Sequence, residues 1–280
     1  MNNINFVKYN GLGNNFLLVD NCTRQISSPS QLAAAMCDIH FGIGADGLIL
    51  AEKSGKYDIT MRIFNSDGSE AEMCGNGVRC FTKFVLDYDI LKRDTLTVAT
   101  LAGPVKCERI STTPGRDLIA VDMGEPAFSS KDFTGREKTV INGREYIFVS
   151  MGNPHAVTFV DNFDFDYQQT GSIVENHTRL FPSRTNVEFV KKESTTAIAM
   201  RVWERGCGET MACGTGACAA AVAAVKQGLL ERSKNTVHLR GGDLEIEWQQ
   251  SNRLLMTGAA DLVCEGRYFD KSREKNDTNK

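Results

Sequence analysis

Short apolar runs separated by glycine-rich turns dominate this chain. Runs of this length and composition are typical of β-strands. They fall at residues 16–19, 48–50, 59–64, 95–100, 119–122, 146–150, 156–160, 197–203, 236–240, 244–248 and 254–257. The pattern therefore predicts a protein built mainly of β-sheet.

Helical periodicity is confined to four segments. Apolar residues recur at helical spacing over residues 78–88, which predicts a helix with one apolar face. Residues 217–227 are rich in alanine and end before Gly228, a residue type that commonly follows a helix. Because an alanine-rich helix is thin, we expect it to be buried on all sides. Weaker helical patterns cover residues 31–40 and 166–176.

Two cysteines occupy matching positions in opposite halves of the chain. Cys74 precedes a Gly-Asn-Gly turn and Cys213 precedes a Gly-Thr-Gly turn, and each turn opens one of the two stronger helices. Unpaired N–H groups and the positive end of the helix dipole meet at such a position, so we expect a lowered thiol pKa and an adjacent anion site. Two thiols facing one small acid suit removal of a proton from one face of a carbon and its return to the other.

The sequence around both cysteines follows the same order of elements: a strand, a glycine turn, the cysteine and a buried helix. This repetition predicts an α+β fold of two pseudo-symmetric domains. We expect an N-terminal domain over residues 1–118, joined by 264–280, and a C-terminal domain over 119–263. A chain of 280 residues with 41% hydrophobic residues is long enough for two packed cores.

The composition limits the kinds of partner that the protein is expected to bind. A net charge of -3 gives no basic surface of the kind that nucleic acids or anionic membranes select. No signal-like N-terminus and no apolar run of about 20 residues is present, so we expect a cytoplasmic protein that binds a small molecule. Nine cysteines, an odd number, favour reduced thiols over a disulfide framework.

Two alternative kinds of site find little support. The cysteines form no C-x-x-C motif and the four histidines are isolated, which argues against zinc. Residues 42–47 match G-x-G-x-x-G, but a strand-like run follows them where a dinucleotide fingerprint requires a helix. We therefore expect no metal and no cofactor. Taken singly, His155 is more typical of a structural residue, and Glu204 with Arg205 of a surface ion pair.

Taken together, the motifs resemble those of the diaminopimelate epimerase family, which works without pyridoxal phosphate. The matching segments are 11–14, 64–68, 73–80, 152–155, 186–187, 204–206 and 212–216. The resemblance implies two domains, each a β-barrel-like sheet around a central helix, with the site in the cleft between them, and a homodimer. It also implies epimerisation of LL-2,6-diaminopimelate to meso-diaminopimelate, a step of lysine and peptidoglycan precursor biosynthesis.

The resemblance also implies roles for particular residues. Cys74 and Cys213 are the two acid–base residues, with Cys74 acting on the L configuration, and His155 and Glu204 assist them. The groups expected to bind the reacting α-carboxylate are the amides of Gly75, Asn76, Gly214 and Thr215. The residues expected to recognise the distal amino acid end are Asn14, Asn65, Asn153, Asn186 and Arg205, with Glu204 near the ammonium group.

The chain departs from the family pattern at four positions. Asn10 and Asn15 stand where relatives often carry histidine and aspartate, Gly47 where some carry glutamine, and Ala259 where proline is common. These departures leave room for an altered substrate preference.

Three alternatives stay open. A racemase of the same superfamily acting on another amino acid, such as histidine, would keep both cysteines; proline-type enzymes usually carry histidine where Asn76 stands. An isomerase of the phenazine-biosynthesis type shares the fold but lacks the cysteine pair. A non-catalytic amino-acid-binding protein would need the recognition residues but not two thiols.

Overall fold

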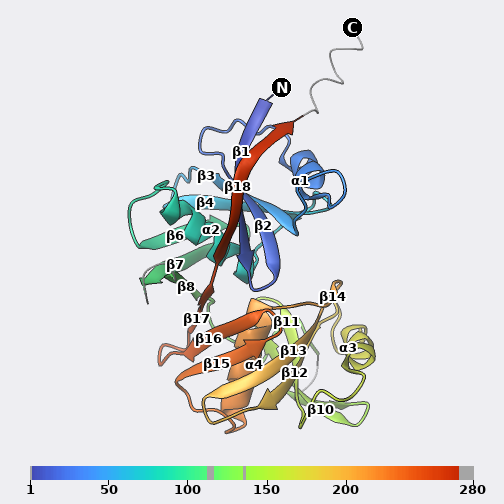
Figure 1. The fold of residues 1–280 in the computed structure, drawn as a ribbon. Coiled ribbons are helices and arrows are strands. Elements are labelled where there is room, and N and C mark those ends of the chain that lie inside the picture. The colour runs from blue at the N-terminus through green and yellow to red at the C-terminus, as the bar shows by residue number, and fades with distance from the viewer. Residues whose placement is uncertain (1, 112–116, 135–136, 271–280) are drawn as a thin grey trace. The chain divides into compact units, whose positions relative to one another are not determined.

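The structure, a computed structural model, describes residues 2–111, 117–134 and 137–270. It divides into two compact units, Met1–Ile119 with Ala259–Lys280 and Ala120–Gly258. Figure 1 labels most of their helices and strands. The domain boundaries drawn from the sequence, after residues 118 and 263, stay a prediction.

In the described residues, the first unit is built of paired strands and two helices. Its strands are β1 (Asn2–Gly11), β2 (Asn14–Asp20), β3 (Gly47–Glu52), β4 (Ile59–Asn65), β5 (Glu70–Ala71), β6 (Thr95–Thr100), β7 (Gly103–Ser111) and β18 (Asp261–Asp270). They pair in the order β18–β1–β2–β3–β4–β6–β7, with β5 also paired to β4. The helices are α1 (Pro29–Cys37) and α2 (Gly75–Asp87).

The second unit repeats this plan. Its strands are β8 (Asp117–Asp122), β9 (Lys138–Ile141), β10 (Arg144–Ser150), β11 (Pro154–Phe159), β12 (Asn186–Lys192), β13 (Ala197–Glu204), β14 (Gly208–Glu209), β15 (Lys234–Leu239), β16 (Gly242–Trp248) and β17 (Leu254–Ala259). They pair in the order β9–β10–β11–β12–β13–β15–β16–β17, with β14 also on β13. The helices are α3 (Tyr167–Glu175) and α4 (Gly214–Lys226).

The two units share their pairing pattern as well as their order of elements. From β1 to β7, successive pairs are antiparallel, parallel, antiparallel, parallel and antiparallel. From β10 to β16 the same sequence of pairings recurs. The prediction of an α+β fold of two pseudo-symmetric halves is therefore confirmed.

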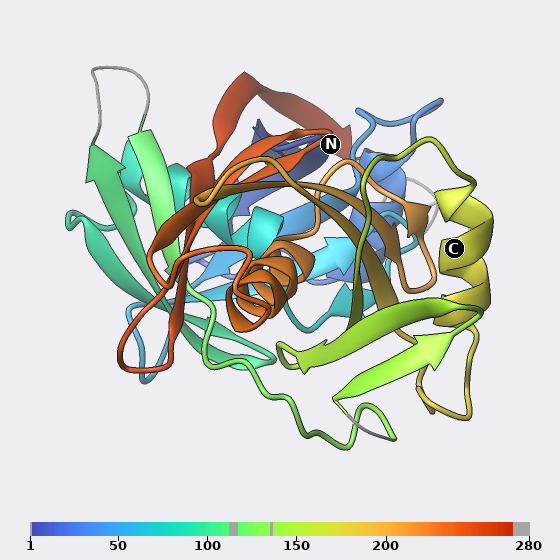
Figure 2. The ribbon, with the colours of Figure 1, turned by 90° about the horizontal axis from the view of Figure 1, so that it is seen from below.

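Each sheet wraps around one central helix. Helix α2 packs against β1, β2, β3, β4 and β7, and α4 packs against β10, β11, β12, β13, β15 and β16. Figure 2 shows α4, in orange, surrounded by the strands of its own unit. Phe81 of α2 and Ala220 of α4 are fully buried. Small side chains let α4 sit inside a closely drawn sheet, as its alanine-rich sequence predicts.

Most of the expected elements are found within one to three residues. The expected helix over 31–40 is α1, but it ends at Cys37 because the chain turns at Asp38, whose carboxylate accepts the N–H groups of His40 and Phe41. The sequence pattern missed β1, β5, β7, β9, β12, β14 and β18. Among the described residues, no helix is long and apolar enough to cross a membrane.

The burial of α4 generates a stability prediction. Replacing Ala220 by leucine adds three heavy atoms where no space is exposed, so we expect the free energy of unfolding to fall by about 1–3 kcal/mol. The matched control is Ala34→Leu on the exposed face of α1, which should change it by less than about 0.5 kcal/mol. Urea unfolding followed by circular dichroism measures both; equal effects of the two variants would contradict a tightly enclosed α4.

Candidate active site

Both cysteines are the N-cap residues of the central helices. The Sγ atom of Cys74 accepts the N–H of Gly77 at 3.4 Å, and that of Cys213 accepts the N–H of Gly216 at 3.4 Å. Space at the third position is tight in the second unit, because a Cβ on Gly216 would lie 2.8 Å from a carboxylate oxygen of Glu188 and would require that side chain to shift. The predicted match between the two cysteine sites is thus present in the geometry, one site in each unit.

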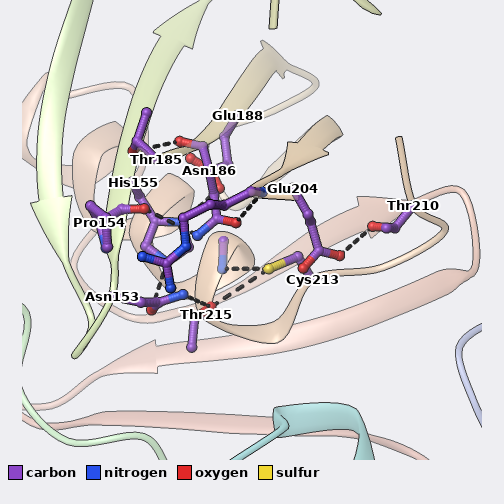
Figure 3. Close-up of polar contacts among 12 residues, drawn as sticks. Asn153, Pro154, His155, Thr185, Asn186, Glu188, Glu204, Thr210, Cys213 and Thr215 are labelled. Carbon is purple, nitrogen blue, oxygen red and sulfur yellow. Dashed lines mark hydrogen bonds and ion pairs between the residues drawn. The ribbon is translucent and has the colours of Figure 1, made fainter. Parts of the chain in front are cut away.

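The surroundings of Cys213 are buried and acidic. Its Sγ atom lies 3.5 Å from the hydroxyl of Thr215. The carboxyl of Glu204 lies beside the sulfur and accepts a hydrogen bond from Thr210 (Figure 3). Burial raises the pKa of the Glu204 carboxyl, and the nearby carboxylate of Glu188 raises it further.

The expectation of a lowered thiol pKa is wrong for Cys213. Burial raises its pKa well above the ordinary value for a thiol, and the carboxylates of Glu204 and Glu188 act in the same direction. Hydrogen bonds from Thr215 and from the Gly216 amide lower it by less. The effect of the helix N-terminus on the pKa is therefore smaller than the effects of desolvation and of the neighbouring carboxylates. Together these effects favour the protonated thiol at Cys213.

His155 and Glu188 form a fully buried pair next to this cysteine. The Nδ1 atom of His155 lies 2.7 Å from Oε1 of Glu188, and its Nε2 atom lies 3.0 Å from Oδ1 of Asn153. The sequence analysis did not single out Glu188. The sequence carries no clear signal for it, because Glu188 alternates with the apolar residues Val187 and Phe189, as a solvent-facing residue of a strand does.

Two of the expected recognition residues of this unit, Asn186 of β12 and Arg205, meet at the turn after β13. Asn186 is buried and holds the turn: its Oδ1 accepts the N–H of Arg205 at 2.9 Å, and its Nδ2 donates to the carbonyl of Pro154. Glu175 of α3 also holds it, by accepting the N–H of Gly206 and the indole N–H of Trp203. The guanidinium of Arg205 is exposed and donates to a backbone carbonyl at residue 183.

In the first unit, two expected recognition residues lie together. The side chain of Asn76 is buried and donates to Oδ1 of Asn14 at 2.6 Å, at the start of α2 beside Cys74. Asn65 is exposed at the end of β4 and donates to the hydroxyl of Ser69.

Three of the four positions that depart from the family pattern have local structural contacts that bear on the departure. Asn10 donates to Oδ1 of Asn15 at 3.2 Å, so the two asparagines pair with each other. A Cβ on Gly47 would lie 2.7 Å from the carbonyl oxygen of Phe64, so a side chain there requires a shift of the backbone. Nothing in the structure explains Ala259 as a departure.

A metal centre finds no candidate here. Within the described ranges, no group of three or more histidine, cysteine, aspartate or glutamate side chains is arranged to hold a metal ion.

The duplicated fold is shared with several solved structures. A phenazine biosynthesis protein of the PhzF family from Bacillus anthracis matches with a TM-score of 0.72 at 18% identity, over 96% of this chain and 100% of that chain. A hydroxyproline epimerase from Agrobacterium vitis matches with a TM-score of 0.67 at 12% identity, over 95% and 92%. By fold, the chain belongs to this class of two-unit α+β proteins.

Sequence comparison narrows the class to one family. The family model described as diaminopimelate epimerase matches residues 6–129 and 147–263. A diaminopimelate epimerase from Acetivibrio thermocellus is 47% identical over 93% of this chain and 97% of its own length, and one from Methanococcus maripaludis is 45% identical over 93% and 98%. The chain belongs to the diaminopimelate epimerase family and is an isomerase of the pyridoxal-independent type.

The charges around Cys213 generate a prediction on thiol reactivity. Glu204→Gln removes a negative charge beside the sulfur, so the pKa of Cys213 should fall and its alkylation by iodoacetamide at pH 8–9 should become about tenfold faster. Mass spectrometry of the Cys213 peptide measures the rate. The control is Glu209→Gln, whose carboxylate instead contacts Tyr167 and Arg240; it should leave the rate unchanged, and a slower rate in Glu204→Gln would contradict the acidic setting.

Proposed function

We propose that this chain interconverts LL-2,6-diaminopimelate and meso-diaminopimelate without a cofactor, in lysine and peptidoglycan precursor biosynthesis. The observation that carries the proposal is the repeated cysteine N-cap, one in each unit, in a member of this family. Two thiols are what a two-base epimerisation needs, because one must remove the α-proton while the other delivers a proton to the opposite face.

Stabilisation of the carbanion is assigned to the helix N-termini. The α-proton of an amino acid is weakly acidic, so the charge that develops on the α-carboxylate must be stabilised by the site. Backbone N–H groups of Gly75 and Asn76 in α2, and of Gly214 and Thr215 in α4, are suited to this, since helix N-termini favour anions. These donors are fixed by the fold and need no reorganisation during the reaction.

The two cysteines enter the reaction in different protonation states. Because its pKa is raised, Cys213 starts as a thiol and is the proton donor when the LL substrate binds. Cys74 is then the base that removes the proton from the L centre. The reverse direction needs the opposite arrangement, with Cys213 as thiolate and Cys74 as thiol. Each turnover therefore exchanges the roles of the two sulfurs.

Recognition of the distal amino acid end is assigned to the polar groups around both cysteines. Arg205 offers an exposed guanidinium to a carboxylate, and Glu204 a carboxyl to an ammonium group. The asparagines proposed to complete this contact are Asn14, Asn65, Asn153 and Asn186. An amino acid without a second amino acid centre would leave these groups unpaired and should bind poorly.

The test of this function is exchange of the α-hydrogen in D2O, followed by NMR under reducing conditions. We expect exchange with inversion on LL-diaminopimelate and none on L-histidine, L-proline or L-lysine. Cys74→Ala and Cys213→Ala should each lower turnover at least about a thousandfold, because removal of a group that acts covalently or as the acid–base residue is rarely compensated. Exchange on a simple amino acid would identify another racemase, and no exchange would favour a binding protein.

We further propose a cytoplasmic homodimer, with β18 at the interface. This strand exposes about half of the surface of each of its apolar residues Leu262, Val263 and Phe269. Beside it, Phe269 lines a groove of about 800 Å³ together with Phe6, Phe84 and Tyr88. Exposed apolar residues on an outer strand, next to a groove that is lined in part by aromatic side chains, are typical of a protein–protein contact.

Light scattering after size-exclusion chromatography tests the dimer. Phe269→Glu places a charge in the groove and should convert the dimer to a monomer at micromolar concentration. Ile173→Glu, on an apolar residue of α3 that is exposed to a similar degree, is the control and should stay dimeric. A monomeric unmodified protein, or a Phe269→Glu variant that stays dimeric, would contradict this interface.

A further inference from the structure

The duplication of the fold lets each position of one unit be compared with its equivalent in the other. Glu70 lies four residues before Cys74 and pairs with Phe64. Glu209 lies four residues before Cys213 and pairs with Trp203. Phe64 is thus equivalent to Trp203, and the preceding residue Ile63 to Val202. Because Ile49 of β3 pairs with Ile63 and Glu188 of β12 pairs with Val202, Ile49 is equivalent to Glu188.

The contacts under the helices agree with this equivalence. A Cβ on Gly77 would meet the side chain of Ile49, and a Cβ on Gly216 would meet the side chain of Glu188. In the next strand, Leu18 pairs with Ile49 and Val157 with Glu188, which makes Phe16 the equivalent of His155. The first unit therefore carries two apolar residues where the second carries a buried ionisable pair.

A continuous run of polar contacts joins this pair to the sulfur of Cys213 (Figure 3). From Glu188 it passes to His155 and on to Asn153. The Nδ2 atom of Asn153 lies 3.3 Å from the hydroxyl oxygen of Thr215, which lies 3.5 Å from Sγ of Cys213. We call these five residues the Glu188 chain.

The charge of the Glu188 carboxyl depends on its contact with His155. Its side chain is fully buried, and within the part of the chain that the structure describes its Oε2 atom has no hydrogen-bond partner. A buried carboxylate with only one partner is costly to charge unless that partner supplies a proton or a positive charge. The state of the pair therefore follows the proton on His155.

The amide of Asn153 fits the same contacts in two orientations, and each orientation fixes one position of the proton. With Oδ1 towards Nε2 of His155, the proton is on the pair. The Oδ1 atom of Asn153 can only accept, so Nε2 of His155 must carry a hydrogen. The pair of His155 and Glu188 then has no net charge. At the other end, Nδ2 of Asn153 donates to Thr215, whose own hydroxyl hydrogen is left to donate to a thiolate at Cys213.

Rotating the amide of Asn153 by 180° reverses every donor and acceptor. Its NH2 group now donates to Nε2 of His155, which carries no hydrogen, and the pair has a net charge of one negative unit. Its oxygen accepts the hydroxyl hydrogen of Thr215, and the oxygen of Thr215 accepts the S–H of Cys213. One proton is held in both arrangements, either on the pair or on the sulfur, so the net charge of the Glu188 chain is the same.

We propose that Glu188 is a positioning residue that links the proton of the His155 pair to the proton of Cys213. The Cys213 thiolate is favoured while the pair holds its proton, and the thiol is favoured once the pair has lost it. Charge acts in the same direction, because the negative pair repels a thiolate. The groups that face Cys213 are Glu204 from β13 and the Glu188 pair from β12 and β11. The link deepens the proposed function and rests on it for the acid–base role of Cys213.

Thr215→Val removes the hydroxyl from the Glu188 chain and keeps the backbone amide, so it tests the role of the hydroxyl. Without that donor the thiolate is less stable, so alkylation of Cys213 by iodoacetamide between pH 7 and 9 should become about tenfold slower. Thr215→Ser keeps the hydroxyl and should react at close to the unmodified rate. The exposed Cys207 in the same digest is the internal standard. Equal rates in the valine, serine and unmodified proteins would overturn the proposal.

Glu188→Gln tests the other end and should act in the opposite direction. Glutamine keeps the shape and can still accept from Nδ1 of His155, but it cannot make the pair negative, so alkylation of Cys213 should become faster. If each substitution merely disturbed the packing, the alkylation rates of Thr215→Val and Glu188→Gln would change in the same direction. A Glu188→Gln rate at or below that of the unmodified protein overturns the proposal, and thermal unfolding checks that each variant is folded.

The alkylation assay contains no substrate. Its outcome is therefore separate from whether diaminopimelate is epimerised, and failure of the proposed function would leave the link between Glu188 and Cys213 still tested.

Discussion

Each unit buries a whole helix inside its sheet, and this burial places demands on the helix N-terminus. The first N–H groups of a helix have no acceptors within it, and they are costly to bury unpaired. A cysteine N-cap supplies one acceptor, at Gly77 in α2 and at Gly216 in α4. An anionic substrate group is suited to supply others. The packing that stabilises the unit is thus the same feature that holds a thiol at a helix N-terminus, a position that favours an anion.

The sequence predicts the elements better than it predicts their partners. Apolar periodicity locates both central helices and most strands, because these segments are buried on a regular face. It misses β18, where adjacent apolar residues Leu262 and Val263 are both exposed and no period of two exists. It also misleads at Glu188: in β12 this residue alternates with Val187 and Phe189, which suggests a solvent-facing side chain. The strand instead has a core cluster on one face and α4 on the other, so both faces are buried.

The thiol pKa shows why a motif alone does not fix reactivity. A helix N-terminus stabilises a thiolate through partial charges that act over one turn. Removal from water acts on the full charge, and two nearby carboxylates add repulsion. For Cys213 the second set of effects is larger. The residue types next to the motif are visible in the sequence, but the distances that decide the balance come from strand pairing over long separations.

Duplication gives two sites of the same geometry, yet a two-base reaction needs two thiols that differ in protonation. If both cysteines had identical surroundings, neither would be set as the acid for a given substrate, and the enzyme would begin each direction from a mixture of states. The two surroundings differ at equivalent positions, which hold the apolar residues Phe16 and Ile49 in one unit and His155 and Glu188 in the other. A titratable pair can respond to the proton on its cysteine, whereas an apolar pair cannot. In the proposed mechanism, the chemical asymmetry of the reaction therefore lies in the buried positions where the two copies differ, while the backbone that presents the thiols has the same pairing pattern in both.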